Sequence, residues 1–466
     1  MDIPSYIPAD HFFTDEDLPL FEVTATFAYC QVLLKENKGH EIATFDLTVR
    51  DLPKNRNFMI FGGLEEIVCK IKNWRFSSEQ IDVLKKTGLI GSEMAEYLSD
   101  YKFSGSIEAM PEGTVFFPGE PILRLTAPIV EANLFYVFFV NCVPSYTIFM
   151  SKAIRSVIAA EGKTVVSNGG RALGFEAGAK YVRSAYLTGI STRLQLSPLL
   201  KYKIDMPKGL FKTTFHAFIK AFPTEMEAFK AFVKEYPDHE AGLMIDTYDI
   251  VQGLKNAIEI GIELKKNGKG LAAIFIDSGD LVRNSKHARK CLDKAGLTDV
   301  KIVIASNIDE WKIAKLIRAK APVDFFMAIT ELTTVADDPK LEIVYKMAEL
   351  RDGEKVRYTM KHTPGKRSLP GRKQVYRFIE KNVYTKDVIG LDGGKNTGQP
   401  LLVPIFEKGK LVYTLPKLDY IKEYIEDQVA KLPEQYKKLT VQRHPYKVDL
   451  SAELSELVYY CNKSSH

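Results

Sequence analysis

The chain is short of cysteine, the residue that builds zinc sites and disulfide frameworks. Its five cysteines stand far apart, at Cys30, Cys69, Cys142, Cys291 and Cys461. An odd number without paired spacing argues against zinc ligation and against a secreted disulfide scaffold. No apolar signal segment opens the chain,. We therefore predict no metal centre built by the protein alone, and a reducing, cytoplasmic setting.

An excess of one charge is also missing. Lys and Arg number 64, Asp and Glu number 59, and the net charge is +5 at pH 7. The two signs are mostly interleaved, whereas nucleic-acid-binding domains gather cationic residues on one face. We expect no nucleic-acid partner. The local basic segment 361–373 suits a small phosphate-bearing ligand, and a solvated loop is the alternative.

Long apolar runs are rare, and one is long enough to span a membrane. Residues 132–151 carry no charge, and about 20 residues suffice to cross a bilayer. The run contains Asn133, Asn141 and Pro144, which are poorly suited to a single lipid-exposed helix. We favour a buried helix between two domains and expect no membrane partner, with a membrane span as the alternative.

One apolar run ends in groups that can do chemistry. Residues 271–276 have the composition of a buried strand, and Asp277, Ser278, Gly279 and Asp280 follow them directly. Parallel strands are continuous apolar runs, and their carboxyl ends carry the functional groups of α/β proteins. The four residues are also ordinary turn composition, so a purely structural turn is the alternative.

The same arrangement recurs through the middle of the chain. Further apolar runs lie at 242–245, 300–305 and 323–328, and the polar residues that follow them are Asp246, Ser306, Asn307 and Thr330. Amphipathic helical segments separate the runs, with a repeat of about 25–30 residues that is typical of βα units. Right-handed crossovers place all strand tips on one face. The predicted fold class is α/β, and this part forms an (α/β) barrel with a polar mouth.

The sequence on either side of the barrel has a different character. Short strands separated by Pro and Gly precede it, and short strands and a helical region rich in Lys and Glu follow it,. A chain of this length is expected to form two or three domains. We predict an N-terminal α+β domain over 1–145, the barrel over 146–345, and a C-terminal α+β extension over 346–466 that packs on the N-terminal domain.

Several segments resemble a known family. They are Gly62-Gly63-Leu64-Glu65-Glu66, Phe103-Ser104-Gly105, residues 111–121, Glu131-Ala132-Asn133-Leu134, Asp246-Thr247-Tyr248-Asp249, Asp277-Ser278-Gly279-Asp280-Leu281, Ala305-Ser306-Asn307 and residues 369–377. In these segments the chain resembles the nicotinate phosphoribosyltransferases, which have the type II phosphoribosyltransferase fold. The resemblance implies an irregular barrel that shares its site with a β-rich N-terminal domain. It also implies a homodimer in which the partner lends residues to the site.

The resemblance implies a reaction as well. The family joins nicotinate, a pyridine carboxylate, to phosphoribosyl pyrophosphate in NAD salvage, and it couples the step to ATP hydrolysis through a phosphorylated histidine. Mg²⁺ and ATP are therefore the expected cofactors. Displacement at the ribose anomeric carbon builds positive charge that carboxylates can stabilise. Asp277 and Asp280 match the family's acidic pair, and Ser306 and Asn307 match its Ser-Asn pair.

Two more residues take their roles from the resemblance. His216 aligns with the histidine that accepts phosphate from ATP, and a satisfied core histidine is the alternative,. Phe21 falls where the family has an aromatic residue that stacks on the pyridine ring in the partner's site. Simple packing of an amphipathic helix is the alternative for Phe21.

The chain departs from the family at a segment that binds the base. Where the family has Phe-Gly-x-Arg-Arg, this chain has Ser167-Asn168-Gly169-Gly170-Arg171. Arg171 remains as a substrate-binding candidate, while Ser167 and Gly170 replace the stacking aromatic residue and the first arginine. A second family segment, Gly-Thr-Ser-Asn, is replaced by residues 191–195.

Two phosphate-binding features are also altered. Phe275 stands where the family has an arginine, and Met327-Ala328-Ile329-Thr330 replaces a Gly-x-Gly-Thr loop. Ile329 restricts the close approach of backbone to phosphate that glycine allows, and Thr330 is the remaining candidate there. The cations that could compensate are Arg171, Arg183, Arg193 and those of 361–373.

Three functions stay open on this basis. Retention of the acidic pair, His216 and Asn307 favours an active nicotinate phosphoribosyltransferase. Loss of the base-binding residues favours a phosphoribosyltransferase for another base. Ile329 in the phosphate loop favours a non-catalytic family member that acts as a binding or structural protein.

Overall fold

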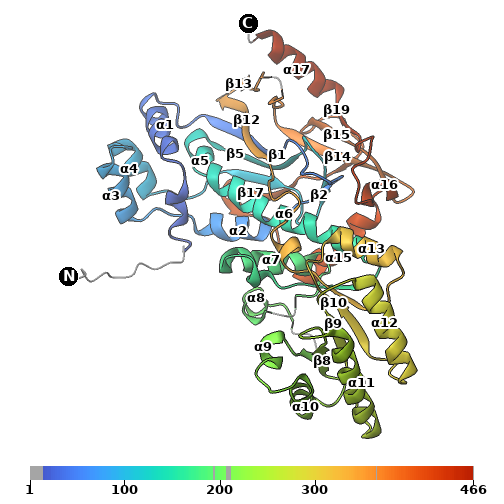
Figure 1. The fold of residues 1–466 in the computed structure, drawn as a ribbon. Helices are drawn as coiled ribbons and strands as arrows, with labels where there is room; N and C mark the ends of the chain where they lie inside the picture. The colour runs from blue at the N-terminus through green and yellow to red at the C-terminus, as the bar shows by residue number, and fades with distance from the viewer. Residues whose placement is uncertain (1–13, 193–194, 206–210, 364, 465–466) are drawn as a thin grey trace, which may run out of the picture.

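The computed structural model describes residues 14–192, 195–205, 211–363 and 365–464. Within these residues, the fold has a β-rich body and a parallel, curled sheet flanked by helices, and Figure 1 shows the long helix α6 lying between them. The predicted α/β class with a barrel-like sheet is confirmed.

A seven-stranded antiparallel sheet joins distant parts of the chain. In spatial order its strands are β13 (Lys355–Tyr358), β12 (Ile343–Asp352), β1 (Ile42–Val49), β5 (Pro121–Pro128), β3 (Ser106–Ala109), β17 (Val403–Glu407) and β18 (Lys410–Leu411). β1 lies between β5 and β12 and is paired along almost its whole length with both. Residues from both ends of the sequence therefore build one sheet.

Helices and a short antiparallel pair of strands, β2 and β4, complete the N-terminal part. They are η1 (Leu18–Phe21), α1 (Thr24–Lys35), β2 (Met59–Ile60), α2 (Leu64–Asn73), α3 (Ser78–Lys86), α4 (Ser92–Ser99), β4 (Val115–Phe116) and α5 (Ile129–Asn133). Helix α3 begins with a capping box, in which the Ser77 hydroxyl accepts from the Gln80 amide and the Gln80 side chain accepts from the Ser77 amide,. The apolar faces of these helices bury against the sheet in one core.

The parallel sheet has six strands, all paired in the same direction. In spatial order they are β6 (Thr164–Val166), β11 (Phe325–Met327), β10 (Lys301–Ile304), β9 (Ala273–Ile276), β8 (Ala241–Met244) and β7 (Lys212–Thr213). The main helices between them are α10 (Glu225–Glu235), α11 (Ile250–Lys266), α12 (Leu281–Lys294) and α13 (Glu310–Arg318). β8 and β9 are fully buried, as expected for strands covered on both faces,.

Helix α6 (Tyr136–Ala159) connects the two bodies. It packs against α7 (Phe175–Leu187) and α13 on the barrel side, and against β2 and β12 on the other. Among the described residues it is the one helix long and apolar enough to cross a membrane, and 72% of its most apolar window is buried in the fold. The boundary that we placed at 145/146 falls inside α6, so the chain does not divide there.

A third sheet and several helices come from the remaining segments. They are η2 (Gly169–Arg171), α8 (Leu196–Lys201), α9 (His216–Ile219), α14 (Thr330–Thr333), β14 (Lys373–Glu380), β15 (Val383–Leu391), β16 (Gln399–Pro400), α15 (Leu418–Ala430), α16 (Glu434–Lys437), β19 (Val448–Leu450) and α17 (Ala452–Ser464). Helix α15 contacts both α7 and β4, so the C-terminal extension packs on both bodies.

A buried charged cluster stabilises this third sheet. Arg377 of β14 and Asp387 of β15 form an ion pair of 2.6 Å that is almost fully inaccessible to solvent. The Asp387 carboxylate also accepts from the Tyr446 hydroxyl at 3.1 Å. Glu120 lies against Asp387, and burial together with that negative charge raises the pKa of Glu120 well above its usual value,. Glu120 therefore holds its proton more firmly than an exposed glutamic acid does.

Candidate active site

Polar residues that we predicted at the strand tips, together with His216 and Thr247, follow consecutive strands of the parallel sheet. They are His216 after β7, Asp246 and Thr247 after β8, Asp277 after β9, Ser306 and Asn307 after β10, and Thr330 after β11. Neighbouring parallel strands end at the same edge of a sheet. The sheet topology therefore brings these segments together at one edge of the sheet.

His216 and Asp277 form the centre of the mouth. The His216 Nδ1 atom lies 3.0 Å from the Thr247 hydroxyl, and the Nε2 atom lies 3.9 Å from the Asp277 Oδ2 atom. About 40% of each side chain is exposed, so the imidazole and the carboxylate face solvent as well as one another. Thr247 thus orients the imidazole and leaves Nε2 directed toward the carboxylate.

Asp246 supports Asp277 from the neighbouring strand. Its Oδ2 atom accepts hydrogen bonds of 2.7 Å from the Asp277 amide and from the Ser278 hydroxyl. Partial burial raises the pKa of Asp277, and the negative charge of Asp246 adds to the rise. His216, a backbone hydrogen bond from Ser306 and the charge of Arg171 oppose it,. The sequence placed Asp246 at a strand tip, but it gave the residue no role.

Asp280 departs from our prediction that both acidic residues line the mouth. It is the N-cap of α12, where its Oδ1 atom accepts from the Arg283 amide at 3.0 Å, and it is exposed. An aspartate in this position satisfies an amide that the helix cannot pair internally. The structure therefore gives Asp280 a structural role, and we do not carry it forward as a catalytic residue.

Ser306 and Asn307 form a tight turn after β10. Both have left-handed backbone conformations, with φ of 79° and 49°, which serine in particular adopts at a cost. The Lys312 ammonium donates to the carbonyl oxygens of both residues, at 3.2 and 2.9 Å. Sequence reasoning selected Ser306 and Asn307 but missed Lys312, because nothing local marks a lysine that folds back on a loop.

In the segment after β6, other contacts take the place of the residues that the family resemblance implies there. The buried Ser167 hydroxyl donates to the Ala328 carbonyl at 2.5 Å and accepts from the Tyr181 hydroxyl at 2.7 Å. The Gln195 side chain accepts from the Gly170 amide at 2.7 Å. A Cβ atom on Gly170 would lie 1.8 Å from the Gln195 Nε2 atom. Gln195 therefore fills the space into which an arginine at position 170 would extend.

Arg171 is the cation that remains close to the carboxylates. It is exposed, and its charge is one of the influences on the pKa of Asp277. Thr330 is also exposed and starts the short helix α14. The residue before it, Ile329, has φ of −114° and ψ of −94°, which lies outside the regular helical and strand regions. The segment 327–330, where the resemblance implies a phosphate loop, thus has an irregular backbone at Ile329.

The other candidate cations are engaged elsewhere. Arg183 is buried between Glu65 and Glu112, at 2.5 and 2.7 Å. Lys373 is buried against Asp46 at 2.7 Å, and Arg372 pairs with Glu108 and Asp392. Lys361, Lys366 and Arg367 are exposed on the loop between β13 and β14. Arg193, the remaining candidate, lies outside the described residues.

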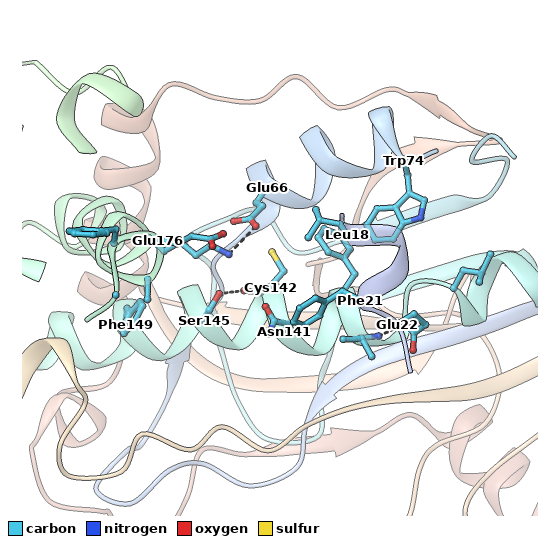
Figure 2. Close-up of a pocket in the computed structure, with 17 residues that line it drawn as sticks. Leu18, Phe21, Glu22, Glu66, Trp74, Asn141, Cys142, Ser145, Phe149 and Glu176 are labelled. Atoms are coloured by element: carbon cyan, nitrogen blue, oxygen red, sulfur yellow. Dashed lines mark hydrogen bonds and ion pairs between the residues drawn. The ribbon is translucent and has the colours of Figure 1, made fainter. Parts of the chain in front are cut away.

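Phe21 lies away from the carboxylates, at a separate apolar cavity. The cavity has a volume of about 570 Å³, and Figure 2 shows Phe21, Leu18 and Trp74 at one end and Phe149 and Glu176 at the other. Asn141, Cys142 and Ser145 of α6 line its floor. Phe21 is 52% exposed, so it is not simply a core residue of its helix.

The fold is that of the nicotinic acid phosphoribosyltransferases. It superposes on the crystal structure of the human nicotinic acid phosphoribosyltransferase with a TM-score of 0.81, over 94% of this chain and 99% of that one, at 21% identity. Sequence profiles of the nicotinate phosphoribosyltransferase N-terminal and C-terminal domains match residues 25–144 and 394–458.

Closer relatives identify the family. The chain is 35% identical to nicotinate phosphoribosyltransferase pncB2 of Mycobacterium tuberculosis, over 97% of this chain and 95% of that protein. It is 31% identical to the nicotinate phosphoribosyltransferase of Bacillus subtilis, over 95% of both. The chain therefore belongs to the nicotinate phosphoribosyltransferase family, a family of enzymes, and the resemblance found in its motifs is confirmed.

Proposed function

We propose that this chain transfers the phosphoribosyl group of phosphoribosyl pyrophosphate to nicotinate and thereby forms nicotinate mononucleotide and pyrophosphate. The observation that carries the proposal is the meeting of His216 and Asp277 at the barrel mouth, with Asp246 behind them. These residues lie in a chain that matches named nicotinate phosphoribosyltransferases over nearly its full length.

The chemistry requires negative charge at this place. The pyridine nitrogen attacks the anomeric carbon of the ribose as the bond from that carbon to the pyrophosphate oxygen breaks. Positive charge builds on the sugar in the transition state, as in glycosyl transfer. The Asp277 carboxylate stabilises that charge. The Asp277 backbone is held in place by the hydrogen bond that its amide donates to the Asp246 carboxylate.

Mg²⁺ fits the residues around Asp277. No group of three or more His, Cys, Asp or Glu side chains in the described ranges is arranged to hold a metal alone. However, the Asp246 Oδ1 atom is buried and has no hydrogen-bond partner among the residues described. Mg²⁺ is commonly held by one or two carboxylates together with substrate phosphates. Asp246 and Asp277 would hold the ion, which neutralises charge on the leaving pyrophosphate.

His216 supports coupling to ATP. A phosphoryl acceptor needs one ring nitrogen fixed and the other accessible, and Thr247 occupies Nδ1,. Nε2 is then the nitrogen that takes up the phosphoryl group.

Recognition of the base depends on Arg171 and Gln195. Arg171 supplies the positive charge that a pyridine carboxylate needs. Gln195 presents a neutral amide where the family has an arginine, and this observation favours a second candidate function, transfer to a pyridine that carries a neutral substituent. The two candidates differ only in the base.

The complete site is proposed to need a second copy of the chain. Phe21 and Phe175 are exposed by 52% and 80%, and both line the cavity beside α6. Exposed aromatic side chains of this kind are common where a partner docks. A homodimer covers the cavity in this proposal, and the reaction takes place in the cytoplasm.

Measurement of pyrophosphate release tests the function. The purified protein is incubated with phosphoribosyl pyrophosphate and Mg²⁺, with and without ATP, and with either nicotinate or nicotinamide. We expect release with nicotinate, and a faster rate with ATP. Release only with the carboxamide would support the second candidate. No release with either base, and no thermal stabilisation by phosphoribosyl pyrophosphate, would identify a non-catalytic member.

A further inference from the structure

The parallel sheet encloses a second cavity, separate from the one beside α6. Its volume is about 390 Å³. Among the residues that line it are Thr164 and Val166 of β6, Lys301 and Val303 of β10, and Phe325 and Met327 of β11. Side chains two residues apart on a strand point to the same face of a sheet. The cavity therefore lies on one face of the curled sheet, within its curve.

A row of small residues explains why this space is hollow. Thr213 of β7 is paired with Gly242 of β8, and Gly242 is paired with Ala273 of β9. In closed parallel barrels, layers of bulky branched side chains fill the interior. No side chain larger than threonine projects from these three neighbouring positions, so the layer that they form cannot fill the interior.

Three phenylalanine rings line the cavity. Phe211 lies edge-on to Phe275 and to Phe325, with ring centroids 5.9 and 5.6 Å apart. A Cβ atom on Gly242 would lie 2.6 Å from the Phe275 ring, so this ring covers the glycine. Aromatic side chains in a concave site contact flat apolar ligands through large areas. The walls of the cavity therefore favour an aromatic occupant.

The polar end of the cavity lies where the strands begin. The lining residues at this end are exposed, and they are His239 before β8, Asp299 before β10 and Lys301 at the start of β10. His239 has a left-handed backbone with φ of 56°, and a Cβ atom on Gly270 would lie 2.0 Å from its ring. The cavity therefore opens to solvent at the amino ends of the strands, opposite the barrel mouth.

Size and charge define the occupant further. An apolar cavity of about 150 Å³ holds a benzene ring, so the larger volume here suits two fused rings. The opening carries one carboxylate, Asp299, and one ammonium group, Lys301, which lies 3.7 Å from the Asp324 carboxylate. These charges balance, and they give no preference for an anion or a cation. A neutral ring system with one polar atom at the open end matches both the walls and the opening.

We propose that the hollow within the parallel sheet is a binding site for a neutral bicyclic aromatic molecule, which enters at the amino ends of the strands and lies among Phe211, Phe275 and Phe325. His216, Asp246 and Asp277 are not among the described residues that line this cavity. The site is therefore distinct from the proposed transfer site. Binding there goes beyond the proposed function and does not depend on it.

Titration calorimetry of the full chain with indole, a neutral bicyclic aromatic, tests this site. Val303→Phe places a ring in the middle of the cavity, because Val303 is paired with both Phe275 and Phe325. Thr164→Trp obstructs the cavity from an exposed position at the start of β6. Lys163→Trp adds the same side chain at the exposed neighbouring position, which does not line the cavity, and is the matched control.

The wild type and Lys163→Trp should bind indole with equal affinity and with a negative change in heat capacity, the mark of apolar burial. Val303→Phe and Thr164→Trp should each weaken binding by at least about 10-fold, because a close-packed interior does not make room for both rings. Thermal melting of each variant checks its folding, and Thr164→Trp decides the test if Val303→Phe does not fold. No saturable binding to the wild type, or wild-type affinity in Thr164→Trp, overturns the proposal.

A competition experiment separates this site from the transfer site. The indole titration of the wild type is repeated with an excess of nicotinate, and the affinity for indole should not change. Displacement of indole by nicotinate would place both in one site and overturn the proposal. A protein that releases no pyrophosphate but binds indole with the expected response to Thr164→Trp loses the proposed function and keeps this site.

Discussion

Replacement of Asp277 by asparagine separates a catalytic carboxylate from a structural one. The substitution keeps the size and shape of the side chain and removes its negative charge. Asp277 lies 3.9 Å from the His216 Nε2 atom and is 40% exposed. The substitution should therefore affect folding and turnover to different extents, and the two effects can be estimated separately.

The effect on stability should be small. Two unit charges about 4 Å apart interact by roughly 1 kcal/mol in water and roughly 4 kcal/mol at an effective dielectric constant of about 20. Exposure of both side chains places this pair near the lower figure, and measured exposed pairs contribute about 0–1 kcal/mol. Asp277→Asn should thus change the free energy of unfolding by less than about 1 kcal/mol.

The effect on turnover should be much larger. A preorganised group that stabilises developing charge contributes about 3–4 kcal/mol to the transition state, which corresponds to about 10²–10³ in rate. The loss should appear in kcat, because the charge on the sugar develops only as the bond to pyrophosphate breaks. Turnover is measured by pyrophosphate release, and stability by thermal melting of the same preparations.

Asp280→Ala is the matched control, because it removes the neighbouring carboxylate that caps α12. Loss of an N-cap costs about 0.5–2 kcal/mol, so this variant should melt earlier and keep most of its turnover. The two variants should therefore show opposite patterns. If Asp277→Asn keeps wild-type turnover, or if Asp280→Ala loses it without loss of stability, our assignment of the two carboxylates is refuted.

Three further predictions concern other parts of the molecule. Incubation with labelled ATP should give an acid-labile, base-stable phosphoryl adduct that His216→Ala abolishes, and a label that persists in this variant would place the phosphorylation elsewhere. The pKa of Glu120 is raised in the folded chain above its usual value of 4.5, so its contribution to stability is fully present below that usual value and is lost as pH rises toward the raised folded pKa. The melting temperature of Glu120→Gln relative to wild type should therefore rise from pH 5 to pH 8, whereas Asp387→Asn, which leaves Arg377 buried without its partner, should cost about 3–5 kcal/mol throughout. Equal losses in both variants would contradict a raised pKa of Glu120. Light scattering at micromolar concentration should give the mass of a dimer, and a monomer would remove the shared-site proposal for Phe21.

The strand tips of the barrel could be predicted from the sequence because their signal is local. Each buried strand is a continuous apolar run, and the first polar residues after it must lie at its end, as for Asp277 and Ser306,. The error at Asp280 arose at the same place. An aspartate directly before an amphipathic helix is the ordinary signature of an N-cap, and Asp280 has that role rather than the one that the family's acidic pair implies.

The remaining features could not be predicted, because they depend on contacts between distant segments. Nothing near Gln195 in sequence shows that its amide fills the space beside Gly170. In sequence Lys312 is one of several lysines on an amphipathic helix, and its contacts with the turn before that helix depend on the fold. The boundary at 145/146 failed for a related reason, since the change in composition there is real but the chain continues through it as one helix.

The position of β1 within its sheet has a consequence for the order of folding. Its two neighbours are β5, about 80 residues later in the chain, and β12, about 300 residues later, after the whole barrel,. During synthesis one edge of β1 stays unpaired until the ribosome has completed the barrel. Such an edge is open to pairing with other chains. Nascent or truncated chains that end before Ile343 should therefore aggregate more readily than the complete chain, and full-length chains should fold slowly.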